Sequence, residues 1–131
     1  MAERCFHLVL PDEWSRRPTP AWAPRSLAAE GFIHASTASQ LAGTLEAHYA
    51  RATDVYLLEL CPARTADAMR FEASRGGALF PHLYRELEPD DVLRWWKLHA
   101  RDGRFKLPKL AAQHANDAPA GHAGTPPDQL P

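Results

Sequence analysis

The sequence predicts a small α+β domain whose sheet is split, mixed or antiparallel, and flanked by helices. One observation is the order of the expected elements, which runs strand, helix, strand, helix and then mainly strands. This order differs from the regular alternation of a doubly wound fold. A second observation is that no Gly-x-Gly-x-x-Gly follows the first strand, and no Lys-Ser/Thr follows Gly76-Gly77. Neither of the two common phosphate-binding loops is therefore expected.

The N-terminal part is expected to contain two strands separated by irregular chain. Residues 5–10 are apolar and predict the first strand. Pro11 and the two acids after it suit the first turn of a helix. Several prolines between residues 15 and 24 interrupt regular structure. Residues 31–35 then predict a short strand that carries His34 near its end.

The clearest helix is expected over residues 37–50. Thr37 and Gln40 have the spacing of a capping box, in which each side chain accepts from the other residue's backbone N–H. Leu41 and Leu45 place apolar groups on one face, at the spacing of an amphipathic helix.

The rest of the chain is expected to be mainly extended. Strands are predicted over residues 54–60, 69–73 and 92–99, with an extended segment at 84–87 and an edge strand at 105–107. The segment from Phe71 to Tyr84 contains Gly76-Gly77 and Phe80-Pro81. It predicts a strand end that turns, because glycine allows unusual backbone angles and proline lacks an N–H.

The composition indicates a domain over residues 1–107 and a tail over residues 108–131. The tail has several prolines and no apolar period, so it is expected to be disordered. The remaining residues are enough for one two-layer core.

Charge and cysteine content narrow the expected partners and location. The formal net charge is −1 over 131 residues, which disfavours nucleic acid without excluding a local cluster of Arg70, Arg75 and Arg85. No apolar run is long enough to span a bilayer, so no membrane association is expected. The N-terminus lacks a signal-peptide core, which favours the cytoplasm. The two cysteines have no zinc-binding spacing, so no metal is expected.

Two short segments concentrate the residues that carry chemistry. The first, Gly31-Phe32-Ile33-His34-Ala35-Ser36-Thr37, ends a strand beside a helix N-terminus, where an anionic or hydroxyl-rich ligand is favoured. The second is Phe71-Glu72-Ala73-Ser74-Arg75-Gly76-Gly77-Ala78-Leu79-Phe80-Pro81-His82-Leu83-Tyr84. Together they hold more hydroxyl, imidazole, carboxylate and guanidinium groups than a core needs, which indicates a site.

These two segments together resemble a small bacterial family, domain of unknown function 952, over about residues 4 to 99. The resemblance implies a fold similar to the ADP-ribosyltransferases, which bind NAD as a substrate in the cleft of a split sheet. It also implies that His34 and His82 correspond to the two histidines of the tRNA 2′-phosphotransferase group. The glutamate of many ADP-ribosylating toxins has no evident counterpart in the last strand.

The expected catalytic residues are His34, His82 and Glu72. The expected ligand-binding residues are Ser36, Thr37, Ser74, Arg75, Gly76, Gly77 and Tyr84. In this interpretation His34 donates to ribose hydroxyls, Arg75 binds a phosphate, and Tyr84 stacks on nicotinamide. Structural alternatives stay open: Ser36 as a helix cap, Arg75 paired with Glu72, His82 bonded to backbone, and Tyr84 in the core.

The expected function is binding of NAD, or of a related ADP-ribosyl or phosphorylated nucleotide, with ADP-ribosyl transfer as the reaction such a cleft would support. The sequence leaves open whether the cleft is catalytic and which protein or other acceptor it would serve. One alternative is a non-catalytic module that binds a nucleotide or a protein. Another is a hydrolase of a phosphorylated small molecule.

Overall fold

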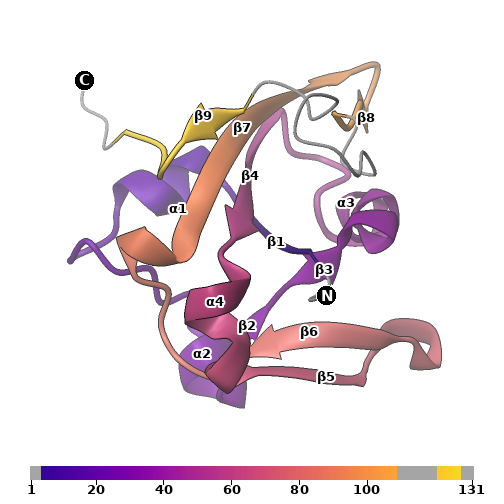
Figure 1. Ribbon diagram of the computed structural model, residues 1–131. Coiled ribbons are helices and arrows are strands. Elements are labelled where there is room, and N and C mark those ends of the chain that lie inside the picture. The colour runs from indigo at the N-terminus through magenta and orange to yellow at the C-terminus, as the bar shows by residue number, and fades with distance from the viewer. Residues whose placement is uncertain (1–3, 109–120, 128–131) are drawn as a thin grey trace.

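A computed structural model describes residues 4–108 and 121–127 and has the expected α+β architecture, with two antiparallel sheets (Figure 1). The larger sheet has the strand order β3-β1-β4-β7-β8, and β9 also pairs with β7. Its strands are β1 (Cys5–Val9), β3 (Ser36–Thr37), β4 (Asp54–Leu60), β7 (Val92–Arg101), β8 (Arg104–Phe105) and β9 (His122–Ala123). The smaller sheet has the order β2-β6-β5 and contains β2 (Ile33–His34), β6 (Leu79–Leu83) and β5 (Met69–Ala73).

Short helices connect these strands. They are α1 (Pro11–Ser15), α2 (Arg25–Glu30), α3 (Leu41–His48) and α4 (Pro62–Thr65), with 3₁₀ turns η1 (Ala38–Gln40), η2 (Ala66–Ala68), η3 (Arg75–Gly77) and η4 (Pro89–Asp91). The predicted capping box of Thr37 and Gln40 is confirmed, and it starts η1, which leads directly into α3. None of the helices described is long and apolar enough to cross a membrane.

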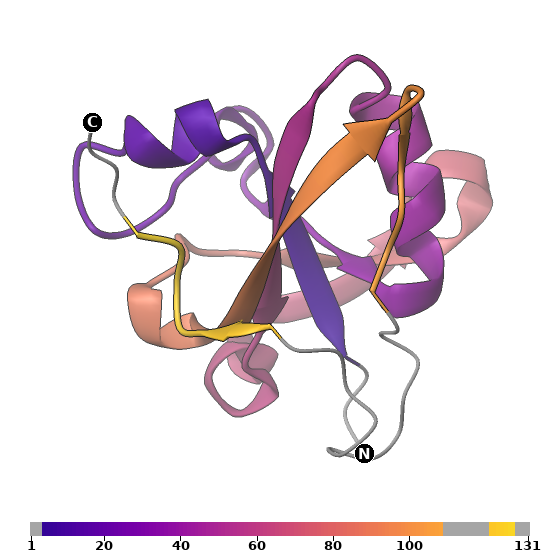
Figure 2. The same ribbon diagram turned by 90° about the horizontal axis from the view of Figure 1, so that it is seen from above.

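The core has two parts, one on each face of the larger sheet. Alternate strand residues point to opposite faces, so Phe6 packs with Leu41 and Leu45 of α3 on one face. On the other face Leu58 packs with Trp14 of α1 and with residues of the smaller sheet. Figure 2 shows α1 and α3 on opposite sides of the strands β1, β4 and β7. The smaller sheet therefore lies on the same side as α1.

The two sheets share one stretch of chain, residues 33–37. Ile33 and His34 pair with β6, whereas Ser36 and Thr37 pair with β1. Ala35 lies between them and donates its N–H to the Pro81 carbonyl, at 3.0 Å. The sheet is thus split at this segment, as the sequence analysis expected.

The sequence analysis predicts no strand over residues 79–83, where Pro81 lies. In the structure these residues form β6, the central strand of the smaller sheet. Proline lacks the N–H of a ladder bond, but here its carbonyl is used, by Ala35. The preceding turn is as expected: Gly76 and Gly77 have φ of 70° and 80°, the left-handed region that glycine tolerates. The expected extended segment at 84–87 is reduced to one bridge, between Leu87 and Trp22.

The prediction of a disordered tail over residues 108–131 is wrong for residues 121–127. β9 pairs with β7, and His122 stacks on Trp95 with ring centroids 4.4 Å apart. The Trp14 indole donates to the carbonyl of Pro126, at 3.2 Å. Trp14 and Trp95 thus bind a segment of the tail that has no apolar period of its own. The tail residues 109–120 and 128–131 lie outside the described residues.

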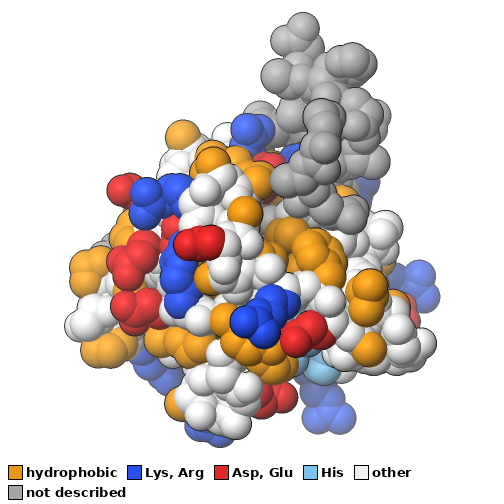
Figure 3. Space-filling view, turned by 60° about the horizontal axis from the view of Figure 1, so that its bottom comes forward, with side chains coloured by type: hydrophobic (Ala, Val, Ile, Leu, Met, Phe, Trp, Pro, Cys, Tyr) orange, Lys and Arg blue, Asp and Glu red, His pale blue; other side chains and the backbone are white. Residues whose placement is uncertain are grey.

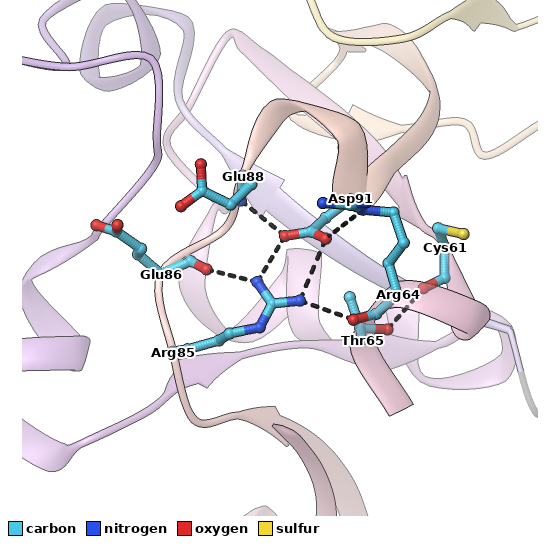
Figure 4. A network of polar contacts seen from close by, with 7 residues as sticks. All are labelled: Cys61, Arg64, Thr65, Arg85, Glu86, Glu88 and Asp91. Carbon is cyan, nitrogen blue, oxygen red and sulfur yellow. Dashed lines mark hydrogen bonds and ion pairs between the residues drawn. The ribbon is translucent and has the colours of Figure 1, made fainter. Parts of the chain in front are cut away.

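An ion cluster around Asp91 joins the end of the smaller sheet to the start of β7 (Figure 4). The Asp91 side chain is 0% exposed and accepts from Arg85 through two nitrogens, at 2.7 and 3.2 Å, and from Arg64 at 3.0 Å. The Glu88 amide adds a fourth bond, at 2.7 Å. Burial by itself raises the pKa of Asp91, but the bonds from Arg85, the Glu88 amide and Arg64 outweigh it and lower that pKa. Asp91 is therefore a paired anion.

Removing residues 121–131 should lower the free energy of unfolding by about 2 kcal/mol, because β-ladder bonds, the Trp14–Pro126 bond and apolar contacts are all lost. Chemical denaturation of the truncated and full chains measures this difference. A chain that lacks only residues 128–131 is the control, since it keeps every one of these contacts. Equal stability of all three chains would contradict the docking of β9.

Asp91→Asn should destabilise the fold by about 3 kcal/mol, the lower part of the range for breaking a buried ion pair, since both guanidinium groups are partly exposed. Asp90→Asn is the matched control, because Asp90 is the exposed neighbour in the same turn. It should change stability by less than about 0.5 kcal/mol. Urea unfolding compares the two variants, and similar midpoints would show that the cluster does not stabilise the fold.

Candidate functional site

One face of the smaller sheet carries most of the ionisable residues that the sequence analysis selected. His34 of β2 is opposite His82 of β6, and His82 is opposite Arg70 of β5. Directly opposed residues of antiparallel strands project from the same face. Phe32 and Glu72 lie two positions from His34 and Arg70, so the period of two places them on this face as well. We call this surface, made of Phe32, His34, Arg70, Glu72, His82 and Tyr84, the histidine face.

The rings of the histidine face form one contact cluster. Phe32 stacks on His82 with centroids 4.0 Å apart, and His34 meets His82 edge-on at 5.4 Å. The Arg70 guanidinium lies over the Tyr84 ring, 4.9 Å from its centroid. Figure 3 turns the bottom of Figure 1, where β5 and β6 lie, toward the viewer. On this side a basic, an acidic and a histidine side chain lie close together beside hydrophobic side chains. The surface thus combines aromatic faces with charge of both signs.

Glu72 is the anionic centre of the histidine face. Its Oε1 accepts from the Tyr84 hydroxyl at 2.6 Å and bonds His82 Nδ1 at 2.8 Å. The bonds from Tyr84 and then His82 lower the pKa of Glu72, and the same carboxylate raises the pKa of Tyr84. Glu72 is therefore ionised at neutral pH and Tyr84 is not. The carboxylate side chain is 38% exposed, which leaves it accessible to a ligand.

His34 and His82 differ in accessibility. The side chain of His82 is 5% exposed, and its Nε2 is buried with no hydrogen-bond partner among the described residues. The side chain of His34 is 51% exposed, and its Nε2 bonds Glu30 at the end of α2, at 2.7 Å. His34 is therefore the more accessible imidazole, and His82 lies beside it on the neighbouring strand.

A cavity of about 730 Å³ opens beside His34, along the line where the two sheets separate. His34, Ser36, Ser74 and Phe80 line it from the segments that the sequence analysis selected. The Ser36 hydroxyl bonds that of Thr44, at 2.9 Å. The volume of the cavity is within the usual range for small-molecule sites.

Part of the cavity wall comes from β1 and the end of α3. The Tyr49 hydroxyl donates to the Leu8 carbonyl at 3.2 Å. Burial, with the Glu13 charge as a second cause, raises the pKa of Tyr49 to about 12, so this wall presents a neutral phenol. In the described part of the lining, Arg25 is the single cation, while Glu13 and Glu30 are acidic.

His7 and Trp22 line the inner part of the cavity. The His7 ring is buried, with Nδ1 2.7 Å from the His34 carbonyl and Nε2 2.8 Å from the Trp22 indole nitrogen. Burial lowers the pKa of His7 to about 4, with the bond to the His34 carbonyl opposing that shift. His7 is therefore neutral over the physiological range, unlike an exposed histidine.

The structure brings several predicted site residues together and separates others. His34, His82, Glu72 and Tyr84 share the histidine face, and Ser36 and Ser74 line the adjoining cavity. Thr37 is buried in the capping box of η1 and is not among the residues that line the cavity. Gly76 and Gly77 shape the hairpin turn outside that lining. The Arg75 side chain, with its expected place in the cleft, lies outside the described residues.

Sequence reasoning missed four residues near the site, and the period of two is a signal for two of them. Phe32 precedes His34 by two positions and Arg70 precedes Glu72 by two, so both could have been placed beside the selected residues. Glu30 and His7 carry no such signal, because their contacts with His34 depend on how α2 and β1 pack. Among residues 4–108 and 121–127 no group of three His, Cys, Asp or Glu side chains is arranged to hold a metal ion.

Comparison with known proteins found one matching family and similar solved structures. The family described as "Protein of unknown function (DUF952)" matches residues 8–95. The crystal structure of protein CC0527 from Caulobacter crescentus is similar with a TM-score of 0.70 and 29% identity, over 79% of this chain and 93% of that one. Its solution NMR structure gives a TM-score of 0.66 and 28% identity, over 86% and 97%. A search of curated proteins found no match.

The neutral, buried His7 should make stability fall in mild acid. The unfolded chain takes up this proton near pH 6.5, whereas the folded chain takes it up near pH 4. Stability is therefore complete above pH 6.5 and decreases as the pH falls toward 4, by about 3 kcal/mol for the difference in pKa. His7→Asn cannot titrate and should lose this part of the slope. Urea unfolding from pH 7 to 4 measures both proteins, and parallel slopes would contradict the assignment.

Proposed function

Because this chain belongs to the DUF952 family of proteins of unknown function, its own site has to suggest an activity, and we propose that it binds NAD or a related ADP-ribosyl nucleotide. The nucleotide is a substrate or ligand of the cavity beside His34, and its reactive ribose lies over the histidine face. ADP-ribosyl transfer is the reaction proposed for this site, on a fold like that of the ADP-ribosyltransferases.

The observation that carries this proposal is the pairing of His34 with His82 across β2 and β6, next to an ionised carboxylate. Imidazole groups hydrogen-bond ribose hydroxyls or an amide carbonyl. Glu72 supplies a negative charge on the same face, within one hydrogen bond of His82. A sugar that develops positive charge at C1′ is stabilised by such an anion.

The chemistry needs little more than positioning and electrostatics. The bond between ribose C1′ and the nicotinamide nitrogen breaks, and its electron pair leaves with the neutral nicotinamide. An acceptor hydroxyl or water then adds to C1′ and releases a proton. Glu72 is suited to stabilise the cationic sugar, because hydrogen bonds from Tyr84 and His82 hold it ionised and in place. Phe32 and Tyr84 offer aromatic surface for a cationic pyridinium ring.

The cavity lining supports a ligand with hydroxyls and rings. Ser36 and Ser74 face the cavity near His34, and Phe80 and Trp22 offer apolar ring surface. Arg25 is the described cation that could pair a phosphate. Phosphate binding by Arg75 remains a prediction from the sequence.

A non-catalytic nucleotide-binding module is the second candidate, and the burial of His82 favours it. With 5% of its side chain exposed, His82 has little access to a reacting atom. In such a module His82 and Glu72 hold the shape of the surface, and His34 binds the ligand without bond cleavage.

His34→Ala should weaken ADP-ribose and NAD binding about ten-fold, the value of a charged or well-aligned hydrogen bond. Calorimetry with the full chain measures both ligands, and thermal unfolding checks that the variant folds. His99→Ala is the control, since His99 is an exposed histidine of β7 that pairs with Asp54 away from the cavity. A well-folded wild type that binds neither ligand would refute the proposal.

The two candidates are separated by nicotinamide release. If the site is a transferase, Glu72→Gln should lower the rate of release about 100-fold or more, typical for losing charge stabilisation in a transition state, while ADP-ribose affinity changes little. Chromatographic detection of free nicotinamide over hours measures the rate. NAD binding without nicotinamide release by the wild type, with and without added protein acceptors, would instead select the binding module.

A further inference from the structure

We propose that Trp22 and His7 are positioning residues for the candidate site, because together they hold the His34 backbone through a hydrogen-bond chain that can run in only one direction. This inference rests on the proposed function in so far as it takes His34 as the residue that meets the ligand. The chain itself is a property of the protein without ligand.

The chain has two bonds, both inside the molecule. The Trp22 indole nitrogen is 2.8 Å from His7 Nε2, and His7 Nδ1 is 2.7 Å from the His34 carbonyl oxygen. Both Trp22 and His7 are buried, at 8% and 7% exposure. Three elements are thereby linked: the loop before α2, the inner strand β1, and the two-residue strand β2.

The direction follows from what each group can do. An indole N–H only donates, so His7 Nε2 has to accept and carries no proton. The single proton of the neutral ring is then on Nδ1, where it is donated to the His34 carbonyl, which only accepts. If the proton moved to Nε2, two donors would meet at one end of the ring and two acceptors at the other. Trp22 therefore selects the tautomer, and the tautomer selects the bond to His34.

Trp22 is itself well anchored, so the chain starts from a fixed point. Its backbone exchanges two hydrogen bonds with Leu87, at 2.8 and 2.9 Å, in the segment that follows the smaller sheet. Its ring also lies against Trp14, with centroids 6.2 Å apart. Leu87 lies between Arg85 and Glu88, which both bond Asp91, so the anchor is within the segment that the Asp91 cluster holds.

The bond matters for His34 because β2 is short. Its ladder consists of the pairs Ile33–Leu83 and His34–His82, and beyond it the Ala35 N–H bonds Pro81. The His7 bond holds the carbonyl of His34 from the larger sheet, while β6 holds the same strand from the smaller sheet. Losing it would free the backbone from which the exposed imidazole projects, together with the Glu30 contact of that imidazole.

The first experiment needs no ligand. In the full-length wild type at pH 7, ¹⁵N NMR of the histidine rings should show His7 protonated at Nδ1 and not at Nε2. Trp22→Phe keeps an aromatic ring but removes the donor, so the His7 nitrogens should lose this pattern, and the backbone and ring resonances of His34 should shift. Trp95→Phe is the matched control, because Trp95 stacks on His122 and lies in β7, where the strand β4 separates it from His7 in the larger sheet. An Nε2 proton on His7, or unshifted His34 resonances in Trp22→Phe, would overturn the proposal.

The second experiment measures ADP-ribose affinity in two His7 variants. His7→Leu should weaken binding about five- to ten-fold, the value of one lost hydrogen bond, whereas His7→Asn should stay within about two-fold of the wild type, because its amide N–H is near the Nδ1 position. A purely structural His7 would lower the melting temperature in both variants and leave the affinity of the folded protein unchanged. That result would overturn the positioning role. A wild type that does not bind ADP-ribose would refute the proposed function instead, and the NMR experiment would still decide the hydrogen-bond chain.

Discussion

The five residues from Ile33 to Thr37 belong to both sheets, and the geometry of the site depends on this constraint. Ile33 and His34 are bonded to β6, while Ser36 and Thr37 are bonded to β1. The chain thus changes from one sheet to the other within these five residues. The cavity lies where the sheets separate, and His34 and Ser36 reach it from the two sides of the change. The site is therefore a consequence of the sheet topology.

The Asp91 cluster lies in a second connection between the two sheets, the loop from β6 to β7. The chain leaves β6, passes Arg85 and Leu87, and enters β7 after Asp91, so this loop fixes how far the smaller sheet stands from the larger one. Two arginines and a backbone amide compensate the buried carboxylate. A buried ion pair of this kind adds little net stability but is costly to break. Trp22 is bonded both to Leu87 in this loop and to His7, so it connects the loop to His7.

Some titratable groups near the cavity have a fixed charge state, and another is accessible to solvent. His7 is kept neutral by burial and Tyr49 by burial and the Glu13 charge, so neither exchanges protons near neutral pH. Glu72 is kept ionised by its two donors. His34, paired with the exposed Glu30, is accessible to solvent. The cavity lining adds the acidic Glu13 and Glu30 and the basic Arg25 to these groups.

Local sequence determined the features that depend on neighbouring residues. The Thr37–Gln40 capping box, the Gly76-Gly77 turn and the strands β4 and β5 follow from patterns within a few positions, whereas His34 meets His82 only through the pairing of β2 with β6. Only the tertiary structure decided the others. In β6 the Pro81 carbonyl accepts a hydrogen bond from Ala35, and near the C-terminus the Pro126 carbonyl accepts one from Trp14. His7 bonds the His34 carbonyl where the two sheets meet. Those contacts join residues far apart in the chain, where a buried polar group finds its partner only after the elements have packed.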